Sequence, residues 1–283
     1  MIDGNFTLKI GIGLIGHGNH NIIKKNTIKN VLAYGILLYE SKNLGYTLYD
    51  NEIVENTVLN IGEQGNKLTV KGMGIYVMSA QRSVIAENIV TNTLLNSDKS
   101  ESLGAGAISV SLSPNSVIND NEVLRSGMYG IVSDYSFNST FTGNKIKEVK
   151  KSGMYFINQS DILVKNNHFQ NIGETIFKGY FQNTGIGSIK DQIAIKKYHN
   201  LVTGNNIKIE NNQIISDNQL LFFTGTTKNE MGLDNKIGNN TFTNNTITRS
   251  SRKELIEEDI AFRHSSDKNK INGNKIIKNR NGK

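Results

Sequence analysis

Three residues in this 283-residue sequence carry the side chains that proton-transfer chemistry needs: Asp134, Tyr155 and Lys196. A carboxylate can abstract a proton, a phenol can return one, and a cation can neutralise the charge that develops between those steps. Arg263 is a second candidate for the cation. If these side chains lie together, they suit proton abstraction beside the carboxylate of a uronate, with Asp134 as base, Tyr155 as acid and Lys196 or Arg263 as the neutralising charge.

Aromatic and basic residues near these four are candidates for holding a substrate. They are Tyr39, Tyr76, Tyr135, Lys197, His199 and His264. The competing interpretation is ordinary surface polarity, because any outward row of residues contains some charged side chains. We expect no metal and no cofactor. No pair of histidines has the spacing of a metal site, and Ca²⁺ is unsupported because the acidic residues form no compact Asp-x-Asp cluster.

A six-residue phrase, apolar-x-x-Asn-x-apolar, recurs along the whole chain and determines how these side chains are positioned. Its copies centre on Asn26, Asn51, Asn88, Asn121, Asn144, Asn167, Asn212, Asn240 and Asn274. A second apolar strand follows many copies about ten residues later, as at Ile36, Ile131 and Met154, and the next copy comes about thirteen residues after that. The unit is therefore about 23 residues long, with insertions in some copies.

Such a repeat predicts a stacked array, because one unit alone cannot bury its apolar face. Runs of four or five alternating residues indicate strands that pair between successive turns about 4.8 Å apart. A recurrent Asn suits a ladder of side-chain amides at one corner, where it also tolerates a left-handed bend. Side chains alternate along the second strands, one of which is expected to have Ile193 and Ile195 inside. This alternation places Asp134, Tyr155 and Lys196 outward on three successive coils, within about 10 Å of one another along the axis of the stack.

The repeat resembles the pectate-lyase-like superfamily, and the resemblance covers nearly all of the chain. It implies an all-β fold, a single-domain right-handed parallel β-helix of about nine coils spanning residues 1–283. The handedness comes from the resemblance. No enzyme family is identified by motif, since the only proline, Pro114, leaves no Asp-Pro-His signature of mannuronan epimerases.

Insertions are expected at one corner of the coil, after the strand that carries the Asn phrase. They fall near 57–73, 93–105, 172–189 and 249–258, whereas the coils of Asn121 and Asn144 have none. Insertions in repeat proteins tend to gather on one face, often the binding face. The sequence therefore predicts an exposed groove across Asp134 and Tyr155 that reaches Lys196.

Charge and composition limit the classes of molecule that the protein is expected to bind. The formal net charge of +7 favours a polyanion such as an acidic polysaccharide. Nucleic acid is disfavoured because no basic cluster is interleaved with aromatics. We expect an enzyme acting on an acidic glycan, namely a lyase, epimerase or hydrolase. The alternative is a non-catalytic glycan-binding or structural rod of a phage tailspike or surface adhesin, which would be a homotrimer.

Several sequence features, including the pattern at the N-terminus, are relevant to where in or outside the cell the protein is located. The sequence has no cysteine, no apolar run long enough to span a membrane and no signal-peptide pattern at its N-terminus. The repeat begins at once, without a capping helix, so we expect a part of a longer or partner-capped protein. An extracellular, cell-surface or virion-associated location fits the glycan hypothesis.

Overall fold

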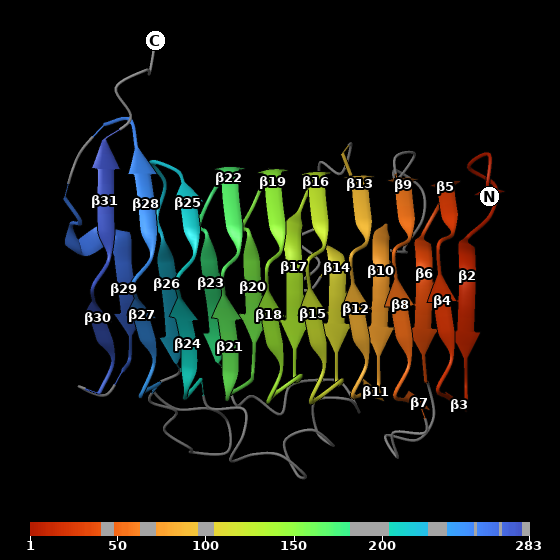
Figure 1. Cartoon of the computed structure of the whole chain (residues 1–283), viewed down its shortest axis with the longest axis horizontal. Coiled ribbons are helices and arrows are strands. Elements are labelled where there is room, and N and C mark those ends of the chain that lie inside the picture. Colours follow the sequence, from red (N-terminus) through yellow and green to blue (C-terminus); the bar gives the residue numbers. More distant parts are fainter. Residues whose placement is uncertain are drawn as a thin grey trace.

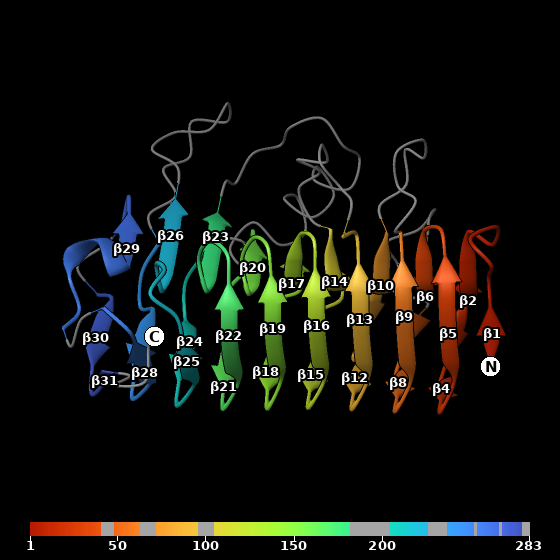
Figure 2. The ribbon, with the colours of Figure 1, turned by 90° about the horizontal axis from the view of Figure 1, so that it is seen from above.

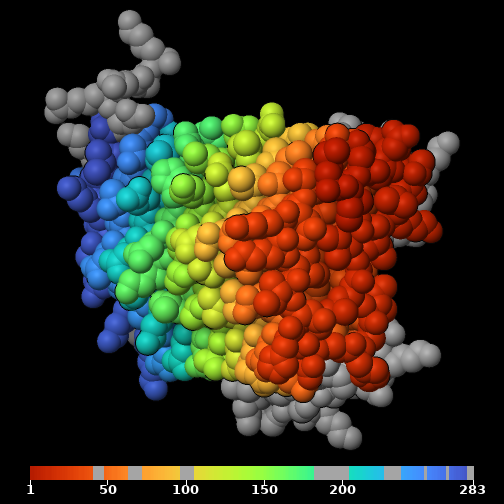
Figure 3. Space-filling view, turned by 45° about the vertical axis from the view of Figure 1, so that its right-hand side comes forward, coloured from red at the N-terminus to blue at the C-terminus, as the bar shows by residue number. Residues whose placement is uncertain are grey.

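The chain folds into a stack of coils in which strands of successive coils lie side by side (Figures 1 and 2). The computed structural model describes residues 1–40, 48–62, 72–95, 105–181, 204–225, 237–251, 254–265 and 268–278. Within these ranges the only helical segment is a 3-10 helix, Glu257–Asp259. The colour bands of the space-filling view run in sequence order from one end to the other (Figure 3), so each coil contacts mainly the coils before and after it.

Three long parallel sheets form the sides of the stack. Sheet A contains β1 (Ile2–Asp3), β5 (Thr27–Val31), β9 (Thr57–Ile61), β13 (Ile89–Thr93), β16 (Glu122–Ser126), β19 (Lys145–Val149), β22 (His168–Ile172), β25 (Gln213–Ile215), β28 (Thr246–Arg249) and β31 (Lys275–Lys278). Sheet B contains β2 (Ile10–Ile15), β6 (Tyr34–Tyr39), β10 (Met73–Met78), β14 (Gly106–Ser111), β17 (Tyr129–Asp134), β20 (Met154–Ile157), β23 (Phe177–Phe181), β26 (Leu221–Gly225) and β29 (Ile260–Arg263).

The third side, sheet D, connects sheet B to sheet A. It contains β4 (Ile22–Lys24), β8 (Glu52–Val54), β12 (Val84–Ala86), β15 (Val117–Asn119), β18 (Thr140–Thr142), β21 (Ile162–Lys165), β24 (Ile207–Glu210), β27 (Thr241–Thr243) and β30 (Lys270–Asn272). A short sheet C of β3 (Gly18–Asn19), β7 (Leu48–Tyr49) and β11 (Ala80–Gln81) lies in the first coils. Every strand pairing is parallel, as the repeat predicts.

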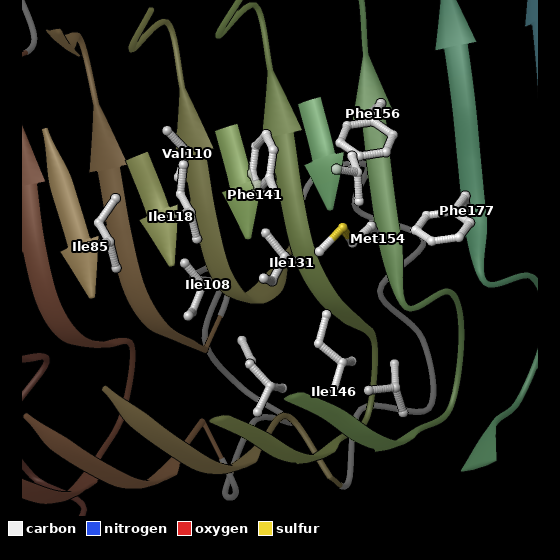
Figure 4. Close-up of a cluster of buried hydrophobic side chains, with 14 of the residues drawn as sticks. Ile85, Ile108, Val110, Ile118, Ile131, Phe141, Ile146, Met154, Phe156 and Phe177 are labelled. Atoms are coloured by element: carbon white, nitrogen blue, oxygen red, sulfur yellow. The ribbon is translucent and has the colours of Figure 1, made fainter. Parts of the chain in front are cut away.

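The core fills the space between the three sheets. In sheet B the inward row runs in register through Ile75, Ile108, Ile131, Met154 and Phe177. These side chains are at most 1% exposed. Ile108, Ile131, Met154 and Phe177 point toward residues of the facing sheet D such as Ile85 and Phe141 (Figure 4). The alternation read from the sequence is therefore confirmed for these strands, and it fixes which residues face outward.

A ladder of asparagines follows the corner between sheets D and A. Asn144 is fully buried, and its Oδ1 accepts from the backbone N and the Nδ2 of Asn121 at 3.1 and 3.0 Å. Asn144 in turn donates from both nitrogens to Oδ1 of Asn167. The predicted stacking of these three residues on neighbouring coils is confirmed. The left-handed bend belongs to the preceding residue, such as Asp120 with φ 54° and Gly143 with φ 67°, and not to the Asn as expected.

Two predicted members belong elsewhere. The ladder runs through Asn56 and Asn245, which bond to Asn88 and Asn274 on the following coils. Asn51 and Asn240 lie at the other end of the sheet D strands, where Asn51 accepts from Asn21 and Asn240 accepts from the backbone of Ile207. The coils of Asn51 and Asn240 therefore have a buried polar position at both corners of sheet D.

The insertions follow the predicted pattern in three places and depart from it in one. The connections from β9 to β10, from β13 to β14 and from β28 to β29 are long, whereas those after β16 and β19 are short. The connection from β22 to β23 is also short, because residues 177–181, expected in a loop at 172–189, form a strand of sheet B. The connection from β25 to β26 is short as well, so the uninterrupted stretch of this corner extends over four coils.

Candidate active site

The candidate site lies on the outer face of sheet B, over β17, β20 and β23. Two outward rows cross these strands. One row contains Val132, Tyr155 and Lys178, and the other contains Asp134, Ile157 and Tyr180. Adjacent strands are about 4.8 Å apart. The carboxylate, the phenol and the ammonium group therefore come from three successive coils of a rigid sheet, which fixes their spacing.

Asp134 is the base candidate of this group. Its side chain is half-buried, and Oδ2 accepts a hydrogen bond from Oγ of Ser111, on the preceding strand, at 3.0 Å. Among the described strands of sheet B, it is the only carboxylate of the two outward rows.

Tyr155 is buried, which corrects the expectation that it points freely into solvent. It is 2% exposed and packs on Tyr129, with the ring centroids 4.8 Å apart. Both belong to a second apolar cluster, outside the coil, with Met73, Leu94 and Val132. Burial raises the pKa of Tyr155 well above its usual range, and the nearby Tyr129, Tyr180 and Asp134 raise it further. Its phenol therefore stays protonated at neutral pH and can donate a proton but not abstract one.

Lys178, which was not among the residues predicted from the sequence, is the cation next to Tyr155. Its Nζ lies 5.9 Å from the centre of the Tyr155 ring and 4.0 Å from Oε2 of Glu174. The ten-residue step from Asn167 ends at Phe177 and would have placed Lys178 in the outward row. The sequence had instead predicted that the segment 193–196 forms the strand beside β20. In the structure, β23 pairs with β20 at that position.

Comparison with known proteins agrees with this architecture. The model of the right-handed beta helix region matches residues 10–214, well over half of the chain. The chain belongs to the right-handed β-helix family. This β-helix therefore has the handedness that the resemblance implied. No curated protein matches it at the level of sequence.

Several solved structures are similar to this β-helix at low identity. The A-module of the mannuronan C-5 epimerase AlgE6 from Azotobacter vinelandii is 14% identical with a TM-score of 0.47, and the match covers 97% of this chain and 85% of that one. A DFA-IIIase from Arthrobacter chlorophenolicus is 13% identical with a TM-score of 0.36, over 89% of this chain and 47% of that one. An alginate lyase from a Paenibacillus species is 9% identical with a TM-score of 0.31, over 98% and 97%. At such distances, function has to be argued from the side chains of this β-helix itself.

Arg263 and His264 lie apart from the group. Arg263 belongs to the row of Asp134, but four strand steps away, or about 19 Å at the usual spacing. Its guanidinium carbon lies 5.0 Å from the centre of the Phe222 ring. His264 follows Arg263 in a left-handed turn with φ 50°. The structure therefore does not place Arg263 close enough to neutralise charge beside Asp134. Lys196, Lys197 and His199 fall outside the described residues.

The predicted substrate-binding tyrosines differ in exposure. Tyr135 is 1% exposed, and its hydroxyl accepts a hydrogen bond from Nδ2 of Asn158 at 2.9 Å, so the expectation that it contacts substrate is wrong. Tyr39 and Tyr76 are half-buried on the outer face of sheet B. Tyr76 stacks on Tyr34 of the preceding coil, with ring centroids 5.7 Å apart and an interplanar angle of 19°. Two tyrosine pairs thus lie along the same face.

The described part of the chain contains no group of three or more His, Cys, Asp or Glu side chains placed to hold a metal ion. Nor does any helix among these residues have the length and apolar character needed to cross a membrane.

Proposed function

We propose that the protein binds an acidic glycan along the outer face of sheet B and abstracts a proton from it at Asp134. The observation that carries the proposal is the alignment of tyrosines with Asp134 and Lys178 on three adjacent strands. Partly exposed Tyr76 and Tyr180 offer rings to sugar faces, while Lys178 and the net charge of +7 attract uronate carboxylates. The paired parallel strands of sheet B keep these groups in place without help from loops.

The roles follow from the chemistry of each group. Asp134 removes the proton beside the uronate carboxylate, and Lys178 stabilises the negative charge that develops there. Tyr155 supplies a proton, to the leaving oxygen in a lyase or to the opposite face of the sugar in an epimerase. Burial raises the pKa of Tyr155, so the phenol carries its proton at neutral pH but releases it less readily than an exposed tyrosine would.

Hydrolysis is the weaker alternative. Glycosidases of the usual kind place two carboxyl groups on either side of the scissile bond. On the described strands of sheet B, the outward rows contain Asp134 and no second carboxylate. Proton abstraction needs one base, one acid and one cation, and those are the groups that meet over β17, β20 and β23.

The test is a screen of acidic polysaccharides with the wild-type chain and with Asp134→Asn and Lys178→Met. We expect unsaturated uronates or changed uronate stereochemistry from the wild type. Asp134→Asn should lower turnover by about 10²–10⁴-fold while glycan still binds, since general base catalysis is typically worth that factor. Lys178→Met should weaken both binding and turnover.

Arg263→Met is the matched control for Lys178→Met, because it removes a cation from the same sheet, four strands from Asp134 and two from Lys178. It should leave turnover within about twofold of the wild type. Binding without any turnover, unaffected by Asp134→Asn, would reduce the proposal to a glycan-binding module. No binding to any acidic glycan would refute it.

A further inference from the structure

The row of outward side chains that contains Asp134 crosses the whole of sheet B. From the first coil to the last, this Asp134 row contains Ile15, Tyr39, Met78, Ser111, Asp134, Ile157, Tyr180, Thr224 and Arg263. All of them except Ser111 are at least partly exposed. In the neighbouring row, by contrast, Ser109, Val132 and Tyr155 are at most 2% exposed. A glycan on this face therefore contacts the sheet mainly through the Asp134 row.

Charged side chains occur in only one half of this face. On β2, β6, β10 and β14, which we call the aromatic half, the two outward rows contain no charged residue. They contain Gly13, Leu37, Tyr76 and Ser109 in one row and Ile15, Tyr39, Met78 and Ser111 in the other. From Ile15 to Asp134 the row makes four strand steps, or about 19 Å at the usual spacing. The charged residues Asp134, Lys178 and Arg263 all lie on β17 or on later strands.

The side chains of the aromatic half are suited to neutral sugars. Tyr39 and Met78 are partners in register, and the hydroxyl of Tyr76 donates to Sδ of Met78 at 3.1 Å. The Tyr76 ring in turn stacks on Tyr34. Aromatic rings and thioethers pack well against the C–H groups of a sugar ring. Glu40 follows Tyr39 directly and is 5% exposed, so it adds a carboxyl group and no cation to this half.

An ionised carboxylate is disfavoured over the aromatic half. Its removal from water costs free energy that a paired cation has to offset. In the outward rows from β2 to β23, the only cation is Lys178, two strands beyond Asp134. A homopolymer of uronates carries a carboxylate on every sugar, and its sugars repeat at a spacing comparable with the strand spacing of about 4.8 Å. Such a chain would place several carboxylates over the aromatic half with no cation beneath them.

We propose that the substrate is a heteropolymer, in which the uronate at Asp134 and Lys178 is flanked by neutral sugars that lie on the aromatic half. The inference rests on the proposed function and narrows its substrate class. Tyr39 and Met78 contact the neutral sugars, and they also reject a polyuronate, because its charges stay unpaired there. Specificity of this kind depends as much on disfavouring the wrong ligand as on binding the right one.

The experiment compares the affinity of the wild-type chain for oligosaccharides of equal length by titration calorimetry, at constant ionic strength. Hyaluronan and unsulfated chondroitin alternate glucuronate with a neutral amino sugar, whereas oligomers of mannuronate, guluronate and galacturonate carry a carboxylate on every sugar. We expect an alternating glycan to bind more tightly than every homopolymer, by about tenfold or more, although it carries fewer charges.

Met78→Lys places a cation in the aromatic half, two strands from Asp134. It should raise the affinity for the homopolymers by about fivefold and leave the affinity for the alternating glycan unchanged or lower. Thr142→Lys is the matched control, because it adds the same charge to a half-buried position on sheet D. It should leave the ratio of the two affinities as in the wild type.

Equal or tighter binding of a homopolymer by the wild type would overturn the heteropolymer inference and leave the proposed function standing. Equal effects of Met78→Lys and Thr142→Lys on homopolymer binding would also overturn it, because the glycan would then not lie on the aromatic half. Absence of binding to every acidic glycan would instead refute the proposed function, and the inference with it. The wild-type comparison decides the question even if Met78→Lys fails to fold.

Discussion

Replacing Asn144 by Leu tests the role of the Asn ladder most directly. The substitution keeps the approximate shape of the side chain and removes its polar atoms. Oδ1 of Asn144 accepts two hydrogen bonds from Asn121, and Nδ2 donates to Asn167 and to the carbonyl oxygen of Ile118 at 2.9 Å each. Asn121 and Asn167 are fully buried, as Asn144 is, so water cannot replace these bonds.

The magnitude follows from the groups left without a partner. Three groups lose their partner: the backbone N–H of Asn121, one Nδ2 hydrogen of Asn121 and the carbonyl oxygen of Ile118. Oδ1 of Asn167 is not among them, because it still accepts from the backbone N–H of residue 144. Each of the three costs about 1–3 kcal/mol. Burial of the leucine side chain returns about 1.5–3 kcal/mol. With the middle of each range, the three lost bonds cost about 6 kcal/mol and burial returns about 2, so the net loss in the free energy of unfolding should be on the order of 4 kcal/mol.

Urea denaturation of wild type and variant gives this difference, and Asn26→Leu is the control. Asn26 stands at the first rung, is half-buried and donates to Asn56 without accepting from an earlier rung. Its substitution should cost less than about 1 kcal/mol, because Oδ1 of Asn56 still accepts from the backbone N–H of residue 26 and the other partner, the carbonyl oxygen of Lys24, is exposed. Equal losses at the two positions, or a loss below 1 kcal/mol for Asn144→Leu, would refute the view that amide stacking stabilises the coils.

Two further outcomes follow from packing and from titration. Gly130→Ala should lower the free energy of unfolding by about 1–3 kcal/mol, since a Cβ there would lie 2.5 Å from the carbonyl oxygen of Gly153 and 2.6 Å from Ile146. Gly13→Ala, whose nearest contact is a side chain at 3.3 Å, should change it by less than about 0.5 kcal/mol, and similar losses at both would contradict the steric reason. Burial raises the pKa of Tyr129 to about 12, so only the unfolded chain ionises at that residue between pH 10 and 12. Stability should be unaffected below pH 10 and fall through that window, and a urea series in Tyr129→Phe should show a shallower fall.

The repeat predicted the fold because strand alternation and a recurrent polar corner are local features. It could not choose between the two corners of sheet D. Asn56 satisfies the same six-residue phrase as Asn51, and the same holds for Asn245 and Asn240. Only the pairing with the next coil decides which amide enters the main ladder. Local sequence cannot show that pairing when an insertion separates the coils.

The site was predicted in part for a related reason. Alternation placed Asp134 and Tyr155 outward, and the structure agrees. Alternation shows only whether a side chain points into the coil or away from it. It could not predict that other side chains would cover Tyr155 on the outer face of sheet B. Lys178 was missed because Phe177, Tyr180 and Phe181 gave their segment the appearance of an aromatic loop.

The side-chain hydrogen bonds between the rungs of the Asn ladder all run in one direction, which gives the molecule a dipole along the stack. From Asn26 to Asn245, each rung donates one Nδ2 hydrogen to Oδ1 of the next rung toward the C-terminal end, and Asn274 accepts the last of these bonds. The side-chain amide dipoles are therefore aligned head to tail, and hydrogen-bonded chains of this kind polarise one another. Partial negative charge accumulates at the first coil and partial positive charge at the last. Charged residues placed at the two ends of the stack are consequently not equivalent, and acidic groups are favoured at the last coil.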